Sequence, residues 1–213
     1  MHALNRRRFL QMTGAGAVAA AVPALSGAAE ELWSSGRNPP TFNLPAGAVD
    51  CHMHIYDDRF PSAPGTTLRP PNASIEQYRK VQARLGVQRN VVVTPSTYGT
   101  DNRCTLDALK RFGPNARGVA VVDTSVTDAQ LAEMHAAGVR AIRFNLSYPG
   151  ATTVDMLAPL ASRIGALGWH IELVVQGAKL PALEPHLLAL PCPLVIDHIA
   201  HVPQPGGMQS DAM

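Results

Sequence analysis

The chain has 213 residues, of which 46% are hydrophobic and 16% are charged, and its formal net charge is +2. This length supports one sizeable hydrophobic core and a single domain. Because the basic residues form no patch interleaved with aromatic side chains, we exclude a nucleic acid as a partner.

Residues 1–29 have the pattern of an export signal. Consecutive arginines at positions 6–8 precede an apolar run over 12–25, and small residues follow at 27–29. These features are typical of a twin-arginine signal peptide, here cleaved near Ala29, and the run is too short for a comfortable membrane anchor. We therefore expect export by the twin-arginine machinery, a mature protein in the periplasm or outside the cell, and no stable membrane anchor.

Beyond the signal, a Pro-containing linker over 30–48 leads into a folded domain over 49–213, in which apolar runs alternate with helical patterns. Capping-box pairs at Ser74/Gln77 and Thr127/Gln130 mark two helix starts. Such alternation implies parallel strands with right-handed crossovers. The expected strands cover 49–55, 90–95, 118–122, 141–145, 171–175 and 193–197, and the expected helices cover 75–85, 105–112, 128–137, 154–167 and 183–190.

Two histidines separated by one residue end the first expected strand, in the segment Asp50-Cys51-His52-Met53-His54. Because side chains alternate along a strand, we expect Asp50, His52 and His54 on one face, with Cys51 and Met53 packed under a helix layer. Imidazoles that converge where a strand meets its loop bind a metal or polarise a carbonyl group. The competing interpretation is a pair of hydrogen-bonded core histidines.

The three cysteines, Cys51, Cys104 and Cys192, have no close spacing, and we expect buried free thiols rather than disulfides. Another histidine, His198, follows the sixth expected strand. Its neighbour Asp197 is expected to face the helix layer, because adjacent strand residues point to opposite faces.

The pattern contains six strands, whereas a (β/α)8 barrel needs eight. No helical pattern follows the sixth strand. The sequence is therefore compatible with an open six-stranded sheet or with a barrel cut short after its sixth strand, and we favour the second.

Several segments resemble the amidohydrolase superfamily. Asp50–His54 is similar to its first-strand signature, and 94–102, 138–145 and 196–198 are similar to the amidohydrolase-2 branch, which includes 2-pyrone-4,6-dicarboxylate lactonases and aldarolactone isomerases. The resemblance covers about residues 46–205. It implies a TIM-like (β/α)8 barrel, incomplete here, whose active site lies at the carboxyl ends of the strands.

The resemblance also implies a hydrolase that acts on a lactone of an acidic small molecule. In that interpretation the N–H groups of His52, His54 and His198 stabilise the oxyanion formed when water attacks the carbonyl group. Arg143 would bind a substrate carboxylate, with the alternative that it pairs with a neighbouring acid. The family's general base is a carboxylate on strand eight, which we expect beyond Met213.

Ser96 and Tyr98 are further candidate substrate-binding residues, with the alternative that they are turn residues beside Gly99. We expect no cofactor, because the fourth strand lacks a terminal lysine and the fifth lacks a terminal histidine for a binuclear metal site. One divalent metal, zinc or manganese, on His52, His54 and His198 is the alternative.

Two further functions stay open at this point. One is a metal-dependent hydrolase or decarboxylase of the same superfamily. The other is an exported, non-catalytic sugar-acid binding protein or an inactive fragment.

Overall fold

A computed structural model describes residues 38–148, 150–203 and 205–209. The expected signal peptide and the first part of the expected linker lie outside these residues. Within the described part of the chain, no helix is long and apolar enough to cross a membrane.

A single parallel sheet organises the described residues, and its strands lie in the order in which they occur in the sequence, β1-β2-β3-β4-β5-β6. Each strand therefore pairs with the next one along the chain, as the alternating pattern predicted. The strands are β1 (Val49–Met53), β2 (Arg89–Val93), β3 (Ala116–Ala120), β4 (Val139–Asn145), β5 (His170–Val174) and β6 (Leu194–Ile196).

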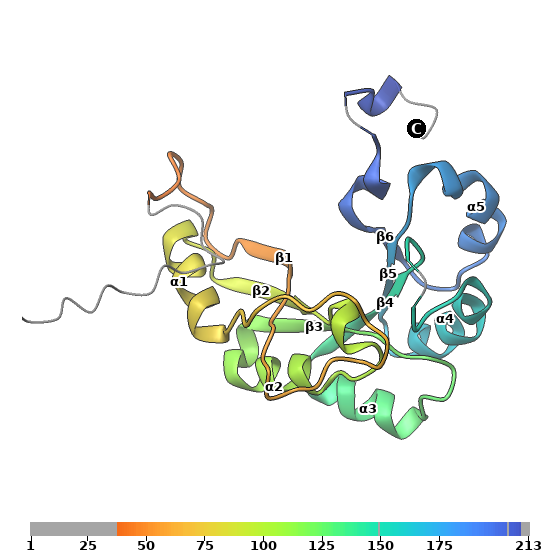
Figure 1. The fold of residues 1–213 in the computed structure, drawn as a ribbon, viewed down its shortest axis with the longest axis horizontal. Coiled ribbons are helices and arrows are strands. Elements are labelled where there is room, and N and C mark those ends of the chain that lie inside the picture. Colours follow the sequence, from red (N-terminus) through yellow and green to blue (C-terminus); the bar gives the residue numbers. More distant parts are fainter. Residues whose placement is uncertain (1–37, 149, 204, 210–213) are drawn as a thin grey trace, which may run out of the picture. The chain divides into compact units, whose positions relative to one another are not determined.

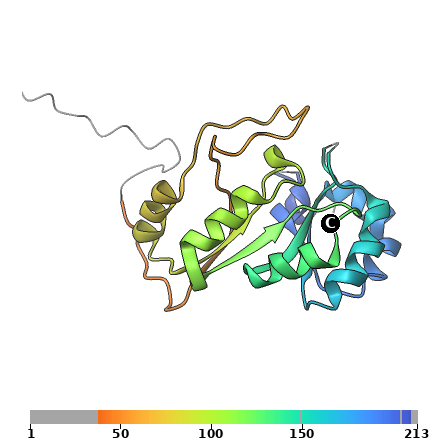
Figure 2. The same cartoon turned by 90° about the horizontal axis from the view of Figure 1, so that it is seen from below.

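Helices connect consecutive strands and cover the outer face of the curved sheet (Figure 1), and a second view shows the same arrangement from below (Figure 2). Both predicted capping boxes form, at Ser74 and Thr127. The α-helices are α1 (Ile75–Leu85), α2 (Arg103–Phe112), α3 (Asp128–Ala136), α4 (Leu157–Gly165) and α5 (Leu180–Leu188). The result is a half-barrel, which agrees with the predicted incomplete (β/α)8 barrel.

The two faces of the sheet carry different side chains. The main core lies between the outer face and the helices and includes Ile142, Phe144 and Ile171. A smaller apolar group, Val93, Val119 and Ala141, forms a separate cluster. Since Ala141 and Arg143 are two residues apart on β4, they share a face, and this inner face holds the charged residues of the candidate site.

The predictions for β1 were partly wrong. The pairing of β1 with β2 shifts register between Asp50 and Met53, so strict alternation does not hold along this strand. Met53 is buried as expected, but Cys51 is exposed. All three cysteines are free, as predicted, although only Cys104 is fully buried.

Asn102 ties the carboxyl ends of two strands together. Its Oδ1 accepts hydrogen bonds from the Thr94 hydroxyl (2.9 Å) and the Val121 N–H (2.8 Å), and its Nδ2 donates to the Val121 carbonyl (2.8 Å). Thr94 follows β2 and Val121 follows β3. One buried side chain thus fixes both loops at the edge where the strands end.

We predict that Asn102→Ala lowers the free energy of unfolding of the full-length protein by about 2–4 kcal/mol, because it leaves the buried N–H and C=O of Val121 unpaired. Denaturation in urea, followed by circular dichroism, measures the change. The exposed Asn115 provides a matched control, and Asn115→Ala should alter the value by less than about 0.5 kcal/mol. Equal effects of the two variants would contradict the role of Asn102.

Candidate active site

Three imidazoles meet at the carboxyl ends of the strands. The ring centroid of His52 lies 5.1 Å from that of His54 and 5.2 Å from that of His198. His52 lies in β1, His54 directly follows this strand, and His198 comes from the segment after β6. The structure therefore brings together the three histidines that were predicted from the sequence to form the site, and we call them the imidazole cluster.

His54 is held in a defined protonation state. Its Nδ1 lies 2.7 Å from the carbonyl oxygen of Val93. A carbonyl oxygen only accepts hydrogen bonds, so Nδ1 carries the proton. Burial lowers the pKa of His54 to about 4, so the ring is neutral at pH 7 and its Nε2 presents a lone pair.

The Nδ1 atom of His52 lies near two carboxylates. It is 3.7 Å from Glu172 Oε2 and 3.7 Å from Asp197 Oδ1. Burial lowers the pKa of His52 below its ordinary value, against the pull of Asp197. The Nε2 atom is buried and has no hydrogen-bond partner among the described residues. An unpaired buried ring nitrogen points to a ligand or water at this position.

A buried ion pair lies next to the cluster. Arg143 Nε donates to Asp197 Oδ2 at 3.2 Å, and both side chains are almost completely excluded from solvent. The prediction that Asp197 faces the helix layer is therefore wrong.

The reason is that β6 ends at Ile196, and the chain then enters the segment η6 (Asp197–His201), whose interior residues are not helical. Four consecutive residues, 198–201, have a positive φ of 50–53°. This left-handed turn, a conformation that costs an L-residue roughly 1–2 kcal/mol, ends the strand alternation on which the expectation rested.

Glu172 is a site residue that sequence reasoning missed. It lies on β5 in register with Arg143 of β4 and is 4% exposed. Burial, and secondarily the charge of Asp197, raises its pKa to about 8, while Arg143 opposes the shift. A single acidic residue inside the apolar run Ile171–Val175 was the signal that could have identified it.

The candidate substrate-binding residues after β2 lie in the short helix η2 (Ser96–Tyr98). Ser96 is exposed, and its hydroxyl accepts a hydrogen bond from Asn145 Nδ2 at 3.0 Å. Asn145 is the last residue of β4, so Ser96 lies at the same edge of the sheet as the cluster.

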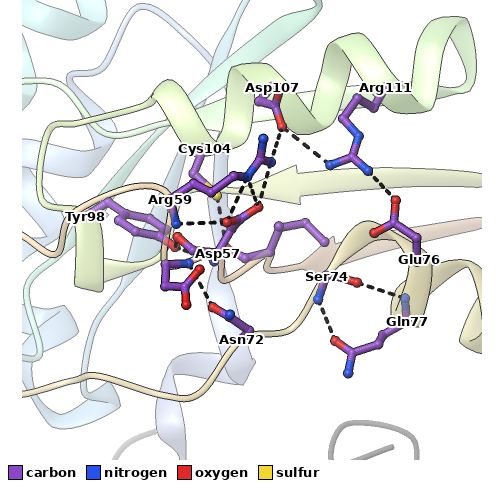
Figure 3. Close-up of polar contacts among 12 residues, drawn as sticks. Asp57, Arg59, Asn72, Ser74, Glu76, Gln77, Tyr98, Cys104, Asp107 and Arg111 are labelled. Atoms are coloured by element: carbon purple, nitrogen blue, oxygen red, sulfur yellow. Dashed lines mark hydrogen bonds and ion pairs between the residues drawn. The ribbon is translucent and has the colours of Figure 1, made fainter.

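Tyr98 is buried, and its hydroxyl accepts a hydrogen bond from the Asp57 N–H at 2.9 Å. Figure 3 shows this contact beside the ion pairs that Arg59 makes with Asp57 and Asp107. These contacts fasten the loop after β1 to α2, so the Tyr98 hydroxyl already has a protein partner. Its role in substrate binding stays a prediction.

Asp50 occupies a different position from the one expected. The Asp50 carboxylate accepts hydrogen bonds from the Tyr78 hydroxyl of α1 (2.8 Å) and from the His52 N–H (3.1 Å), so it supports the backbone of β1 rather than joining the rings. The ring of His201 lies 5.3 Å from that of His198.

A single metal ion would find three donor atoms here. One ligand atom each from His52, Asp197 and His198 lie within 4.8 Å of one another. Three protein ligands and an open position are the pattern of a catalytic zinc site. However, the Asp197 carboxylate is already paired with the buried guanidinium of Arg143, whose positive charge would repel a divalent cation. The site therefore has enough donor atoms for one metal ion, but its net charge does not favour a divalent cation.

Comparison with known proteins identifies the family of this chain. A family model described as Amidohydrolase (Amidohydro_2) matches residues 49–212. A 2-pyrone-4,6-dicarboxylate hydrolase of Comamonas testosteroni is 40% identical over 183 residues, which are 84% of this chain and 60% of the relative. A 4-sulfomuconolactone hydrolase of Hydrogenophaga intermedia is 31% identical over 181 residues, which are 82% of this chain and 59% of the relative.

A solved structure is also similar to this chain. A crystal structure of an Acinetobacter baumannii protein with citric acid bound has a TM-score of 0.69 and 25% identity, covering 78% of this chain and 63% of that one. The chain thus spans about three fifths of the length of the curated relatives it matches. The family predicted from the sequence is confirmed, and the chain belongs to the amidohydrolase family.

Proposed function

We propose that the full-length protein hydrolyses a lactone of an acidic small molecule. The observation that carries the proposal is the convergence of His52, His54 and His198 beside the buried guanidinium of Arg143. Two of the relatives are named as hydrolases of a pyrone dicarboxylate and a sulfonated lactone, both of which carry acidic groups. A third relative binds citric acid, a tricarboxylic acid.

Arg143 is the residue suited to the acidic part of the substrate. Its bond to Asp197 uses only Nε, whereas a guanidinium carries four further N–H groups. Fork-shaped donors bind carboxylates by paired hydrogen bonds. Asp197 fixes the orientation of this fork, which makes the ion pair part of substrate recognition.

The imidazoles divide into two roles. His54 is neutral with its proton on Nδ1, and His52 has its Nδ1 toward two carboxylates, so the Nε2 atoms of both rings accept hydrogen bonds. They are suited to orient the attacking water. Stabilisation of the oxyanion then comes from His198 and Arg143. This differs from the expectation that the N–H groups of all three histidines donate to the oxyanion, because the rings of His52 and His54 present an acceptor instead.

The reaction follows from these roles. The water oxygen forms a bond to the lactone carbonyl carbon, and its proton passes to a base while His198 and Arg143 stabilise the oxyanion. Collapse of the tetrahedral intermediate breaks the ring C–O bond, and the leaving oxygen takes up a proton. By family resemblance the base is a carboxylate of strand eight, which is not among the residues of this chain.

We propose that this chemistry needs no metal, because a guanidinium at 3.2 Å already neutralises the one carboxylate of the candidate metal set. The metal-dependent alternative has the grouping of His52, Asp197 and His198 in its favour. Export by the twin-arginine machinery is also a proposal, supported only by the arginines at 6–8 and the apolar run that follows.

We predict that His198→Ala and His52→Asn each reduce kcat for 2-pyrone-4,6-dicarboxylate by about a hundredfold or more in the full-length protein, because each removes a group placed at the reacting atoms. Steady-state kinetics measures the loss. His186→Ala, on the exposed face of α5, is the control and should keep wild-type turnover. Unchanged turnover in both site variants would remove the proposed assignment.

An NMR titration of the histidine rings tests the protonation state of His54, with the signal assigned from the His54→Asn variant. Because burial favours the neutral ring, we expect its signal to change near pH 4 and not near 6.5. The unfolded chain binds this proton at a higher pH than the folded chain does, so the free energy of unfolding should fall as the pH is lowered from 6.5 to 4. A midpoint near 6.5 would contradict the lone pair assigned to Nε2.

Chelation separates the two candidate chemistries. We predict that prolonged dialysis against a strong chelator leaves kcat unchanged, and that metal analysis finds substoichiometric zinc and manganese. Loss of turnover that returns on adding back one equivalent of metal would favour the metal-dependent hydrolase instead.

A further inference from the structure

Glu172 is the most unusual charged residue of the half-barrel. It interrupts an apolar strand, is 4% exposed, and its Oε2 has no hydrogen-bond partner among the described residues. Burying an unpaired carboxyl group costs free energy that an apolar residue would not. A residue kept at such a cost is more readily explained by function than by packing.

The neighbouring cation does not account for Glu172. Arg143 is its register partner on the adjacent strand, yet the Nε of Arg143 donates to Asp197. Glu172 Oε2 instead lies 3.7 Å from His52 Nδ1, and its other oxygen lies 4.0 Å from His170 Nε2 at the opposite end of the strand. The group at the active site that Glu172 approaches is therefore the ring of His52.

The ring of His52 needs such a neighbour. Its Nε2 is buried and has no hydrogen-bond partner in the part of the chain that the structure describes, and the chemistry of that atom depends on which ring nitrogen carries the proton. Asp197 also lies 3.7 Å from Nδ1, but its position is fixed by the ion pair with Arg143. The Oε2 atom of Glu172, in contrast, has no hydrogen-bond partner among the described residues, so it is the acceptor available to Nδ1.

We propose that Glu172 is a positioning residue that keeps the proton of His52 on Nδ1, so that Nε2 presents its lone pair to the attacking water. The expected effect on kcat rests on the proposed lactone hydrolysis, whereas the expected tautomer of His52 does not. The two atoms lie 3.7 Å apart, and a hydrogen bond between them requires an approach of about 0.5 Å.

This role does not depend on the charge of Glu172. A protonated carboxyl group accepts a hydrogen bond through its carbonyl oxygen, as a carboxylate does. Glutamine offers the same acceptor at the same place, whereas leucine fills a similar volume without one. The pair Glu172→Gln and Glu172→Leu therefore separates the acceptor from the bulk of the side chain.

In the full-length protein we expect Glu172→Gln to keep kcat and Glu172→Leu to lower it by about tenfold to a hundredfold with little change in KM, the range seen for residues that orient a metal-binding histidine. We also expect Glu172→Leu to leave the thermal midpoint unchanged or raised, because it removes an unsatisfied buried acid. Glu184→Leu on exposed α5 is the control for the substitution itself.

A spectroscopic readout does not depend on turnover. Nitrogen-15 NMR of labelled histidine distinguishes the two neutral tautomers, and we expect the Nδ1–H form of His52 in the wild type and in Glu172→Gln, and a mixture in Glu172→Leu. An unchanged tautomer in Glu172→Leu would overturn the proposal. So would a loss of kcat accompanied by a lower thermal midpoint that glutamine does not rescue.

If the wild-type protein proves inactive on every lactone tested, the proposed function fails. The tautomer and thermal measurements then still decide the role of Glu172. The two failures are therefore distinguishable.

Discussion

The buried ion pair between Arg143 and Asp197 organises the rest of the site. It joins the fourth strand to the turn after the sixth and places a positive charge beside three imidazoles. Removing one partner of a buried pair leaves an uncompensated charge, typically at about 3–5 kcal/mol, so neither residue can change independently. The pair fixes the guanidinium fork for an acidic ligand and occupies the one carboxylate of the candidate metal set. In the proposed function, both the binding of an acidic group and a reaction without a metal rest on this one interaction.

His52 and His54 belong to one short motif, but different contacts fix the tautomers of their rings. His54 donates to a backbone carbonyl, so its tautomer is set by the fold. His52 relies on side chains from β5 and η6. Its tautomer can therefore be altered by mutation without disturbing the backbone, which makes His52 the more informative ring for dissecting the mechanism.

Much of this arrangement could be predicted from the sequence. Capping boxes at Ser74 and Thr127 and β-branched runs located the helices and strands, because these signals are local. The meeting of His52 with His198 followed from parallel strands ending at one edge. The errors at Cys51 and Asp197 arose where alternation fails, at a register shift and in a left-handed turn. The apolar run around Glu172 marked it as unusual, but its closeness to His52 and the pairing of Arg143 with Asp197 depend on contacts between strands that the sequence of one strand does not contain.

The central claim is that the imidazole cluster and Arg143 bind and open an acidic lactone at the carboxyl edge of the sheet. A crystal structure of the full-length protein with 2-pyrone-4,6-dicarboxylate, trapped in the inactive His198→Asn variant, tests it most directly. We predict a substrate carboxylate paired with the Arg143 guanidinium, the lactone carbonyl oxygen facing position 198, and the carbonyl carbon facing the Nε2 atoms of His52 and His54 across the site of the attacking water. A ligand bound away from Arg143, or β1 histidines turned away from the lactone, would contradict the account.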